Sequence, residues 1–361
     1  MNKHAYAILD AAEAWDWPAP PCLDVGASTN KASVFKVVCR RLLLCLILES
    51  NNLGGSLLEI FWSEIGRSHP QLLENVKELR HTPYSSYDDT LQILYESIDA
   101  GTVDFNPVFE LATDLFTHIG LAFMNYDDDR FWSLFSPLPT LSPNTPGPES
   151  VKNCKEVLKI SALKRDGTSC PFSEVPYYGL GGIDPTLTHI IPCSINSKAE
   201  TLHYISLIAG NVAMESVLQY SNTIDNVLVV EASVAASHRR NCWGLEAAES
   251  SNNVNHTTYY FKTFESGKTH RAGSVFLRDG DEIIFGQGPE GTQFRNGPHP
   301  ILCNLRLAVS RALYTSGAAE FISQLMHDAD DVNCHHFTIK DQHFHEVLSA
   351  KLLICGRAQM L

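Results

Sequence analysis

A proline-rich stretch near the middle of the chain limits how its 361 residues can fold. Residues 136–148 contain five prolines in 13 positions. Proline fixes φ and removes a backbone donor, which excludes helix interiors and central strands. We therefore expect a linker at 137–149 that separates a helical N-terminal region at 1–136 from a domain at 150–332. A C-terminal tail or helix at 333–361 completes the expected organisation.

Apolar residues recur at helical spacing through the N-terminal region. Within 88–100 they stand at Leu91, Leu94, Tyr95 and Ile98, which places them on one face of a helix. The predicted helices of this region span 5–15, 33–50, 57–65, 70–79, 88–100 and 107–123. The N-terminal region is thus predicted to be helical.

The second half of the chain mixes helix and strand patterns. A short apolar strand is predicted at 187–191, and β-branched and aromatic residues predict another at 257–264. Segments 274–277 and 282–285 flank an Asp-Gly pair, which predicts a hairpin. The predicted helices span 151–163, 196–208, 212–220, 234–240, 300–312 and 317–331, with 243–248 continuing from the fourth of them. The predicted fold class is α+β, with a small antiparallel sheet.

The most distinctive motif is Thr188–Pro192, in which a histidine stands between apolar residues and a proline ends the run. Arg165–Gly167 and Cys170 come before it. Asn226 stands at the start of the next apolar segment, and His238 falls on the helix predicted after that segment. The motif therefore sets a histidine, an asparagine and a second histidine in order along the chain.

This order resembles the ββα-metal site of HNH endonucleases, and most closely the HNH-domain proteins common in filamentous fungi. The resemblance extends over roughly 151–332 and implies an HNH-like ββα unit wrapped by additional helices. It implies His189 as the general base, Asn226 as the residue that orients the loop of that base, and His238 as a ligand of Mg²⁺ or Mn²⁺. In the family the last histidine lies about nine residues beyond the asparagine, where this chain has Ala235. Either a small insertion restores His238 to the site, or the metal ligand is lost.

The charge balance limits the partners. The chain has 27 Lys and Arg against 41 Asp and Glu, a formal charge of -14. Since phosphate binding depends on cationic side chains, a nucleic-acid partner is disfavoured and requires a local basic patch. A small apolar or diphosphate substrate is the alternative. The longest apolar run, 42–48, is too short to span a bilayer. The chain begins without an apolar signal region, and its ten cysteines form no Cys-x-x-Cys pair. We expect an intracellular protein, cytoplasmic or nuclear, without a membrane span.

An acidic triplet gives a second candidate metal site, with Asp127 and Asp128 as its ligands. Acidic motifs bind the magnesium ions of prenyl diphosphates in class I terpene cyclases, which usually space the acids one helical turn apart. Asp129 completes the triplet here, but Phe131 and Trp132 occupy the positions that follow Arg130. An exposed helix end is therefore the simpler interpretation.

Three functions fit these residues. The first is metal-dependent phosphodiester hydrolysis by an HNH-like enzyme. The second is reuse of the scaffold in fungal secondary metabolism, as an enzyme that cyclises or rearranges terpenoid or polyketide intermediates. Aromatic residues of the protein would then line an apolar pocket. The third is a catalytically inactive interaction module, because a fold does not fix a function. The candidate pocket residues are Trp132, Tyr177, Tyr178, Trp243, Tyr259 and Tyr260.

Overall fold

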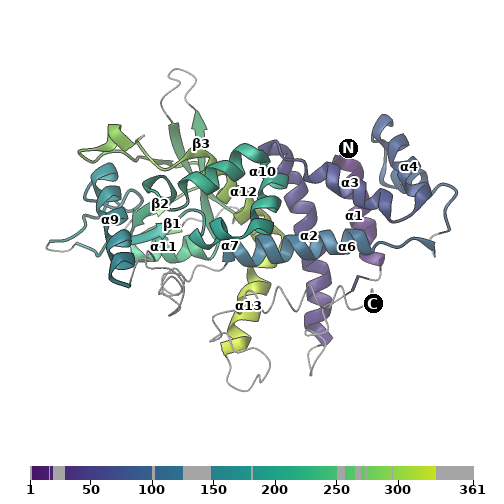
Figure 1. The fold of residues 1–361 in the computed structure, drawn as a ribbon, viewed down its shortest axis with the longest axis horizontal. Helices are drawn as coiled ribbons and strands as arrows, with labels where there is room; N and C mark the ends of the chain where they lie inside the picture. The colour runs from purple at the N-terminus through teal and green to yellow at the C-terminus, as the bar shows by residue number, and fades with distance from the viewer. Residues whose placement is uncertain are drawn as a thin grey trace, which may run out of the picture. The chain divides into compact units, whose positions relative to one another are not determined.

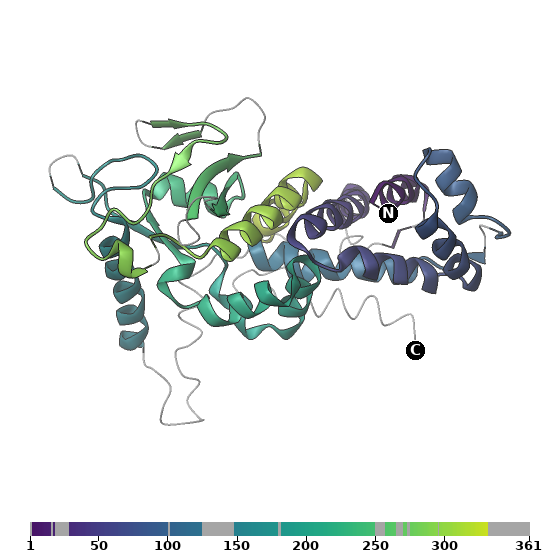
Figure 2. The same cartoon turned by 90° about the horizontal axis from the view of Figure 1, so that it is seen from above.

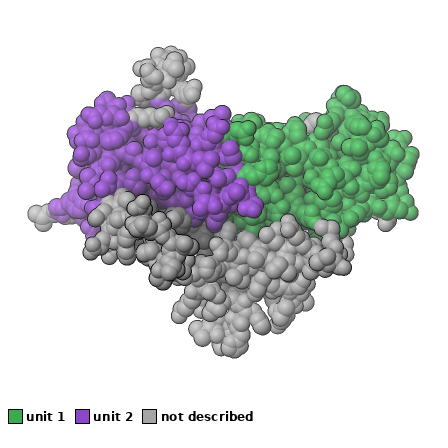
Figure 3. All heavy atoms as spheres, in the orientation of Figure 1, with its two compact units in different colours: residues 1–122, 203–211, 312–361 green, residues 123–202, 212–311 purple. Residues whose placement is uncertain are grey.

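A computed structural model describes most of the chain, which divides into two compact units (Figure 3). The described residues are 2–15, 17–18, 29–99, 102–124, 148–179, 182–249, 257–264, 270–272, 275–294 and 296–330. The acidic triplet at 127–129, residues 137–147 of the predicted linker, and the predicted tail at 333–361 lie outside them. The two units are described separately.

Unit 1 consists of residues 1–122, 203–211 and 312–361. Its described N-terminal part is helical, as predicted. The helices are α1 (Asn2–Ala11), α2 (Thr29–Leu53), α3 (Leu57–Arg67), α4 (Pro70–His81), α5 (Tyr87–Leu94), α6 (Asn106–Leu115) and, from late in the chain, α13 (Ala318–Asp330) (Figure 1). A π-helical turn (Phe116–Leu121) leads from α6 into α7 (Ala122–Met124).

Three phenylalanines tie the core of unit 1 together. Phe35 on α2 lies edge-on to Phe116 at 5.2 Å between ring centroids, and Phe321 on α13 lies 6.1 Å from Phe116. All three side chains are buried. A side chain at Gly120 would meet Ile322 at 3.2 Å. Aromatic packing and this close approach therefore fix α13 beside the N-terminal helices.

The helix predicted at 88–100 ends earlier than expected, at Leu94. Asn75 on α4 explains the stop, because its side-chain amide donates hydrogen bonds to the carbonyls of Leu94 and Glu96 at 2.8 and 3.0 Å. Ser97 then adopts a φ of 61°, which no helix continues. A contact from another helix thus decides the boundary, and the local pattern of apolar residues does not.

Unit 2 consists of residues 123–202 and 212–311. Its helices are α9 (Pro148–Asp166), α10 (Ala199–Tyr220, with residues 203–211 in unit 1), α11 (Ala232–Arg239) and α12 (Pro300–Ser316, which ends in unit 1). Its strands are β1 (Thr186–His189), β2 (Val227–Val230), β3 (Trp243–Glu249), β4 (Thr257–Thr263), β5 (His270–Ala272), β6 (Val275–Leu277) and β7 (Glu282–Ile283). The predicted α+β class is therefore confirmed. Among the described helices of both units, none is long and apolar enough to cross a bilayer.

The strands form three antiparallel sheets, and one predicted pairing is wrong. β1 pairs with β2, β3–β4–β7 form a three-stranded sheet, and β5 pairs with β6. The expected hairpin between 274–277 and 282–285 does not form. Gly280 and Asp281 of its Asp-Gly turn exchange backbone hydrogen bonds with Phe261 of β4 instead, both at 2.8 Å. Pairing with a longer strand therefore outweighs the local turn.

The segment 243–248, expected to continue from a helix, is strand β3. Trp243, Leu245 and Ala247 are all buried, which gives the period of two that a strand requires. On α12, Asn304 pairs its side-chain amide with both backbone groups of Ala247, at 2.8 and 3.0 Å. This contact satisfies backbone groups at the open edge of the sheet.

Candidate functional site

The candidate site is built on the pair β1–β2, with helix α11 packed against β1 (Figures 1 and 2). The strands are antiparallel, and His189 at the end of β1 lies opposite Val227 at the start of β2. All four residues of β2 are buried, as expected of an unbroken run of Val and Leu. Two antiparallel strands followed by a helix are thus present, with α10 between the strands in sequence.

Asn226 positions the chain where it leaves β1. Its side-chain oxygen accepts from the N–H of Ile191 at 2.8 Å, and its amide group donates to the carbonyls of Ile191 and Ser221 at 2.8 and 2.9 Å. Its backbone carbonyl accepts from the N–H of Ile190 at 2.8 Å. Asn226 therefore holds the backbone of the two residues that follow His189, and its role in orienting a catalytic base stays a prediction.

His189 and Asn226 are completely buried, each with an exposed fraction of 0%. A general base must reach the water or hydroxyl from which it takes a proton. In this conformation the His189 ring belongs to the interior of unit 2. The structure thus brings the two predicted catalytic residues to one end of the β1–β2 pair without opening that end to solvent.

His238 faces the core from α11. Its side chain is buried, and its ring centroid lies 4.8 Å from that of Trp243. Burial, followed by the charges of Arg306 and Arg239, holds the pKa of His238 well below its usual range. The imidazole is therefore neutral in surroundings that disfavour a further positive charge, including a metal ion.

The described residues do not fit a resident metal at α11. Ala235, at the position where the resemblance requires a histidine, is 1% exposed and offers only a methyl group. Nowhere among the described residues do three His, Cys, Asp or Glu side chains form a group that could hold a metal. The predicted ligands Asp127 and Asp128 lie outside the described part of the chain. The expectation of Mg²⁺ or Mn²⁺ stays a prediction.

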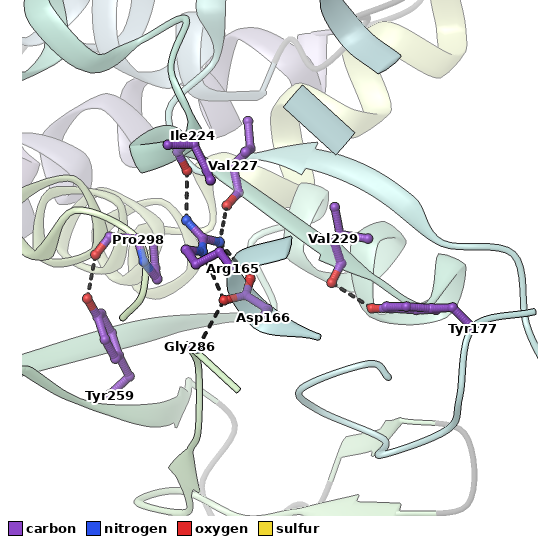
Figure 4. Close-up of polar contacts among 9 residues, drawn as sticks. All are labelled: Arg165, Asp166, Tyr177, Ile224, Val227, Val229, Tyr259, Gly286 and Pro298. Atoms are coloured by element: carbon purple, nitrogen blue, oxygen red, sulfur yellow. Dashed lines mark hydrogen bonds and ion pairs between the residues drawn. The ribbon is translucent and has the colours of Figure 1, made fainter. Parts of the chain in front are cut away.

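A buried ion pair stabilises the site by joining three segments around it (Figure 4). The sequence motif alone does not predict this pair. Arg165, at the end of α9, forms two hydrogen bonds with the carboxylate of Asp166, at 2.8 and 2.7 Å. The same guanidinium donates to the carbonyls of Ile224 and Val227 at 2.8 and 2.9 Å. Gly286 donates its N–H to Asp166 at 3.2 Å. The Arg-Asp pair thus joins α9 to the entrance of β2 and to the loop after β7.

The glycine-rich loop 286–291 caps the end of α9. Gly288 and Glu290 donate their N–H groups to the carbonyls of Arg165 and Lys164, at 2.8 and 3.0 Å. A Cβ at Gly288 would lie 2.2 Å from the Lys164 carbonyl oxygen, so only glycine fits there. These contacts satisfy carbonyls that a helix leaves unpaired at its C-terminus.

Several aromatic residues proposed to line a pocket are core residues. Tyr177 donates its hydroxyl to the carbonyl of Val229 at 2.7 Å, and Tyr259 donates its hydroxyl to the carbonyl of Pro298 (Figure 4). Trp243 is 1% exposed and packs 4.9 Å from the ring of Phe172. Tyr178 is 56% exposed, Tyr260 is half-buried, and Trp132 lies outside the described residues. These contacts account for Tyr177, Tyr259 and Trp243 as packing and hydrogen-bonding residues.

The lowered pKa of His238 predicts that acid destabilises unit 2. Below about pH 6.5 an unfolded histidine binds a proton that the buried ring does not. The free energy of unfolding should therefore decrease as the pH is lowered below this value, by about 1.4 kcal/mol per pH unit from this residue. Urea unfolding of the wild type and of His238→Gln, from neutral pH to about pH 5, measures the difference. An exposed control, His203→Gln, should keep the wild-type slope; an equal slope in His238→Gln would contradict the assignment.

Sequence reasoning missed Arg306, which lies on α12 beside His238. It is 1% exposed and donates to the carbonyls of His238 and Phe123, at 3.3 and 3.1 Å. The available signal is that Arg306 stands at helical spacing from the apolar residues Leu302 and Val309, both of which are buried. Such a charge indicates buried carbonyl partners.

No family model, curated protein or solved structure matches the chain. The resemblance to HNH proteins therefore rests on the sequence residues quoted above and stays a prediction.

Proposed function

We propose that the β1–β2–α11 unit is a non-hydrolytic interaction scaffold, similar in arrangement to the HNH ββα unit. The observation that carries the proposal is the surroundings of His189 and Asn226. Both side chains are fully buried, and the Asn226 side chain forms three hydrogen bonds within the protein. Residues that would serve catalysis in a nuclease serve here to hold the end of a strand.

The residues on α11 support the same proposal. Ala235 offers no ligand, and His238 is a neutral core residue beside Arg306 and Arg239. A nuclease of this type relies on a metal ion to stabilise the leaving oxygen. Among the described residues of β1, β2 and α11 there is neither a set of ligands for that ion nor an exposed histidine that could act as the base.

The charge of the chain favours a protein partner over nucleic acid. At -14 the overall field repels a polyanion. Unless the chain forms a local basic patch, binding to duplex DNA at physiological salt should be weaker than about 10⁻⁴ M. Fluorescence anisotropy with a short labelled duplex measures this affinity, and repetition at low salt separates a general electrostatic effect from specific binding. Micromolar binding at physiological salt would favour the nucleic-acid alternative.

Plasmid nicking tests the proposal most directly. The purified chain should leave supercoiled plasmid intact with Mg²⁺, Mn²⁺ or EDTA. The side chain of His189 is buried, and α11 has Ala235 where the resemblance requires a metal ligand. His189→Ala, with Asn222→Ala as a matched exposed substitution, accompanies the wild type. Metal-dependent nicking by the wild type and by Asn222→Ala that disappears in His189→Ala would overturn the scaffold and establish phosphodiester hydrolysis.

The secondary-metabolism alternative has its own assay. Incubation with prenyl diphosphates and Mg²⁺, followed by mass spectrometry of extracted products, should return unchanged substrate or its hydrolysis background. A cyclised product dependent on the protein would overturn the scaffold in favour of a cyclase. Asp127 and Asp128 would then be the first residues to replace.

A further inference from the structure

Arg306 places a positive charge inside unit 2, at the C-terminal end of α11. Its guanidinium donates to the backbone carbonyl of His238 at 3.3 Å and to that of Phe123 at 3.1 Å. It also lies over the Phe123 ring, 5.7 Å from the centroid. The charge is thus held by helix α12 against two carbonyls and an aromatic face.

A cation suits this place for two physical reasons. The last carbonyls of a helix carry partial negative charge, which a cation near the C-terminus stabilises. Arginine also satisfies such carbonyls by hydrogen bonding, and it tolerates burial better than other cations because its charge is delocalised. Arg306 therefore stabilises α11 by direct contact.

The same place is unsuited to a second cation. His238 and Ala235, both buried, are the α11 residues to which the resemblance directs attention. The first lies beside Arg306 and Arg239, and the second has only a methyl group. A divalent ion between strand and helix would meet repulsion from arginine without gaining a ligand at Ala235.

We infer that Arg306 supplies a buried positive charge at the C-terminal end of α11, and that the β1–β2–α11 unit folds and keeps its shape without a divalent metal ion. This inference rests on the proposed scaffold role. It adds that an arginine of the protein itself supplies positive charge at α11, where a nuclease would use a metal ion. It concerns ion binding and stability, so its test differs from the nicking assay.

The test uses the full chain and compares two arginines at the same helix end. Arg306→Gln should lower the melting temperature by roughly 5–10 °C, because it leaves buried carbonyls without their charged donor. Arg240→Gln removes an exposed arginine at the C-terminal end of α11 and should leave the melting temperature nearly unchanged. Arg306→Lys, which keeps the charge but loses the planar fork, should fall between them. Equal melting temperatures for Arg306→Gln and Arg240→Gln would overturn the inference.

Hydrogen exchange with and without metal completes the test. Peptides covering 186–191 and 227–239 should exchange at the same rate in EDTA, Mg²⁺ and Mn²⁺, since no ion binds there. Slower exchange of these peptides in Mn²⁺, or faster exchange in EDTA, would overturn the inference because bound ligands stabilise the folded state. Such protection without nicking would leave the scaffold role standing, whereas nicking would overturn that role. The two failures are thus distinguishable.

Discussion

Replacing Asp166 with asparagine should lower the free energy of unfolding of unit 2 by about 3–5 kcal/mol. The change keeps the size of the side chain but leaves the Arg165 guanidinium buried without its counter-charge. The Arg165 and Asp166 side chains are 0% and 3% exposed, so solvent does not compensate the loss. Native-state hydrogen exchange of β2 amides measures the effect in unit 2 itself. This choice matters because two compact units need not unfold as one.

Glu290→Gln is the matched control for this prediction. Lys164 and Glu290 also join the end of α9 to the loop 286–291, at 3.0 Å, but their side chains are 49% and 30% exposed. An exposed pair of this kind contributes about 0–1 kcal/mol. Equal losses in Asp166→Asn and Glu290→Gln would contradict the assigned role of the buried pair.

The Arg165–Asp166 pair also gives a structural role to the Arg165–Gly167 motif, which comes before His189 and Asn226 in the sequence. Arg165 reaches the carbonyls of Ile224 and Val227, on either side of Asn226. One guanidinium therefore fixes the backbone that presents Asn226, and Asn226 in turn fixes the residues after His189. The motif contributes to the site by packing and hydrogen bonding, at a distance along the chain that sequence spacing does not reveal.

Local patterns predicted the parts of the fold that depend on local forces. The strand at His189 follows from an apolar run that proline ends, and the break in α10 follows from Gly210, whose φ of 78° favours glycine. The resemblance to the HNH pattern singles out Asn226, and the structure shows that its side chain holds the backbone of Ile191 and Ser221. Each of these assignments depends on residues close in sequence or on a quoted motif.

Long-range contacts decided what the sequence did not predict. β3 is a strand because its alternate residues pack into the core and Asn304 pairs with its edge, although the preceding helix favoured continuation. β7 joins β4, since Phe261 offers backbone partners to the Asp-Gly turn. The surroundings of His238 depend on Arg306, 68 residues further along the chain. Such partners have no signature at the positions that they affect.

The choice between site and scaffold depends on such contacts as well. His189, Asn226 and His238 stand in the order of a nuclease, and the order alone favours catalysis. Burial of all three side chains and the arginine charges near His238 favour a structural role. The same order of residues is therefore compatible with a purely structural role.

Asn226→Ala should lower the free energy of unfolding of unit 2 by about 3–5 kcal/mol, without any measurable effect on plasmid integrity. The substitution removes three buried hydrogen bonds and leaves the N–H and carbonyl of Ile191 and the carbonyl of Ser221 without that partner. Each buried group left unsatisfied costs about 1–3 kcal/mol, and relaxation of the loop recovers part of that cost. Hydrogen exchange should accelerate first at Ile190 and Ile191, where the chain leaves β1.

Asn222→Ala provides the comparison, because Asn222 is exposed in the turn four residues earlier. A change of less than about 0.5 kcal/mol is expected there. Asn226→Asp separates the two halves of the interaction: it keeps the acceptor for the Ile191 N–H but loses the donors to the Ile191 and Ser221 carbonyls. Its loss should therefore approach that of Asn226→Ala, since a buried carboxylate also lies beside two carbonyl oxygens. If Asn226→Ala were as stable as Asn222→Ala, Asn226 would not hold the residues that follow β1. The main support for a structural role at this site would then be gone.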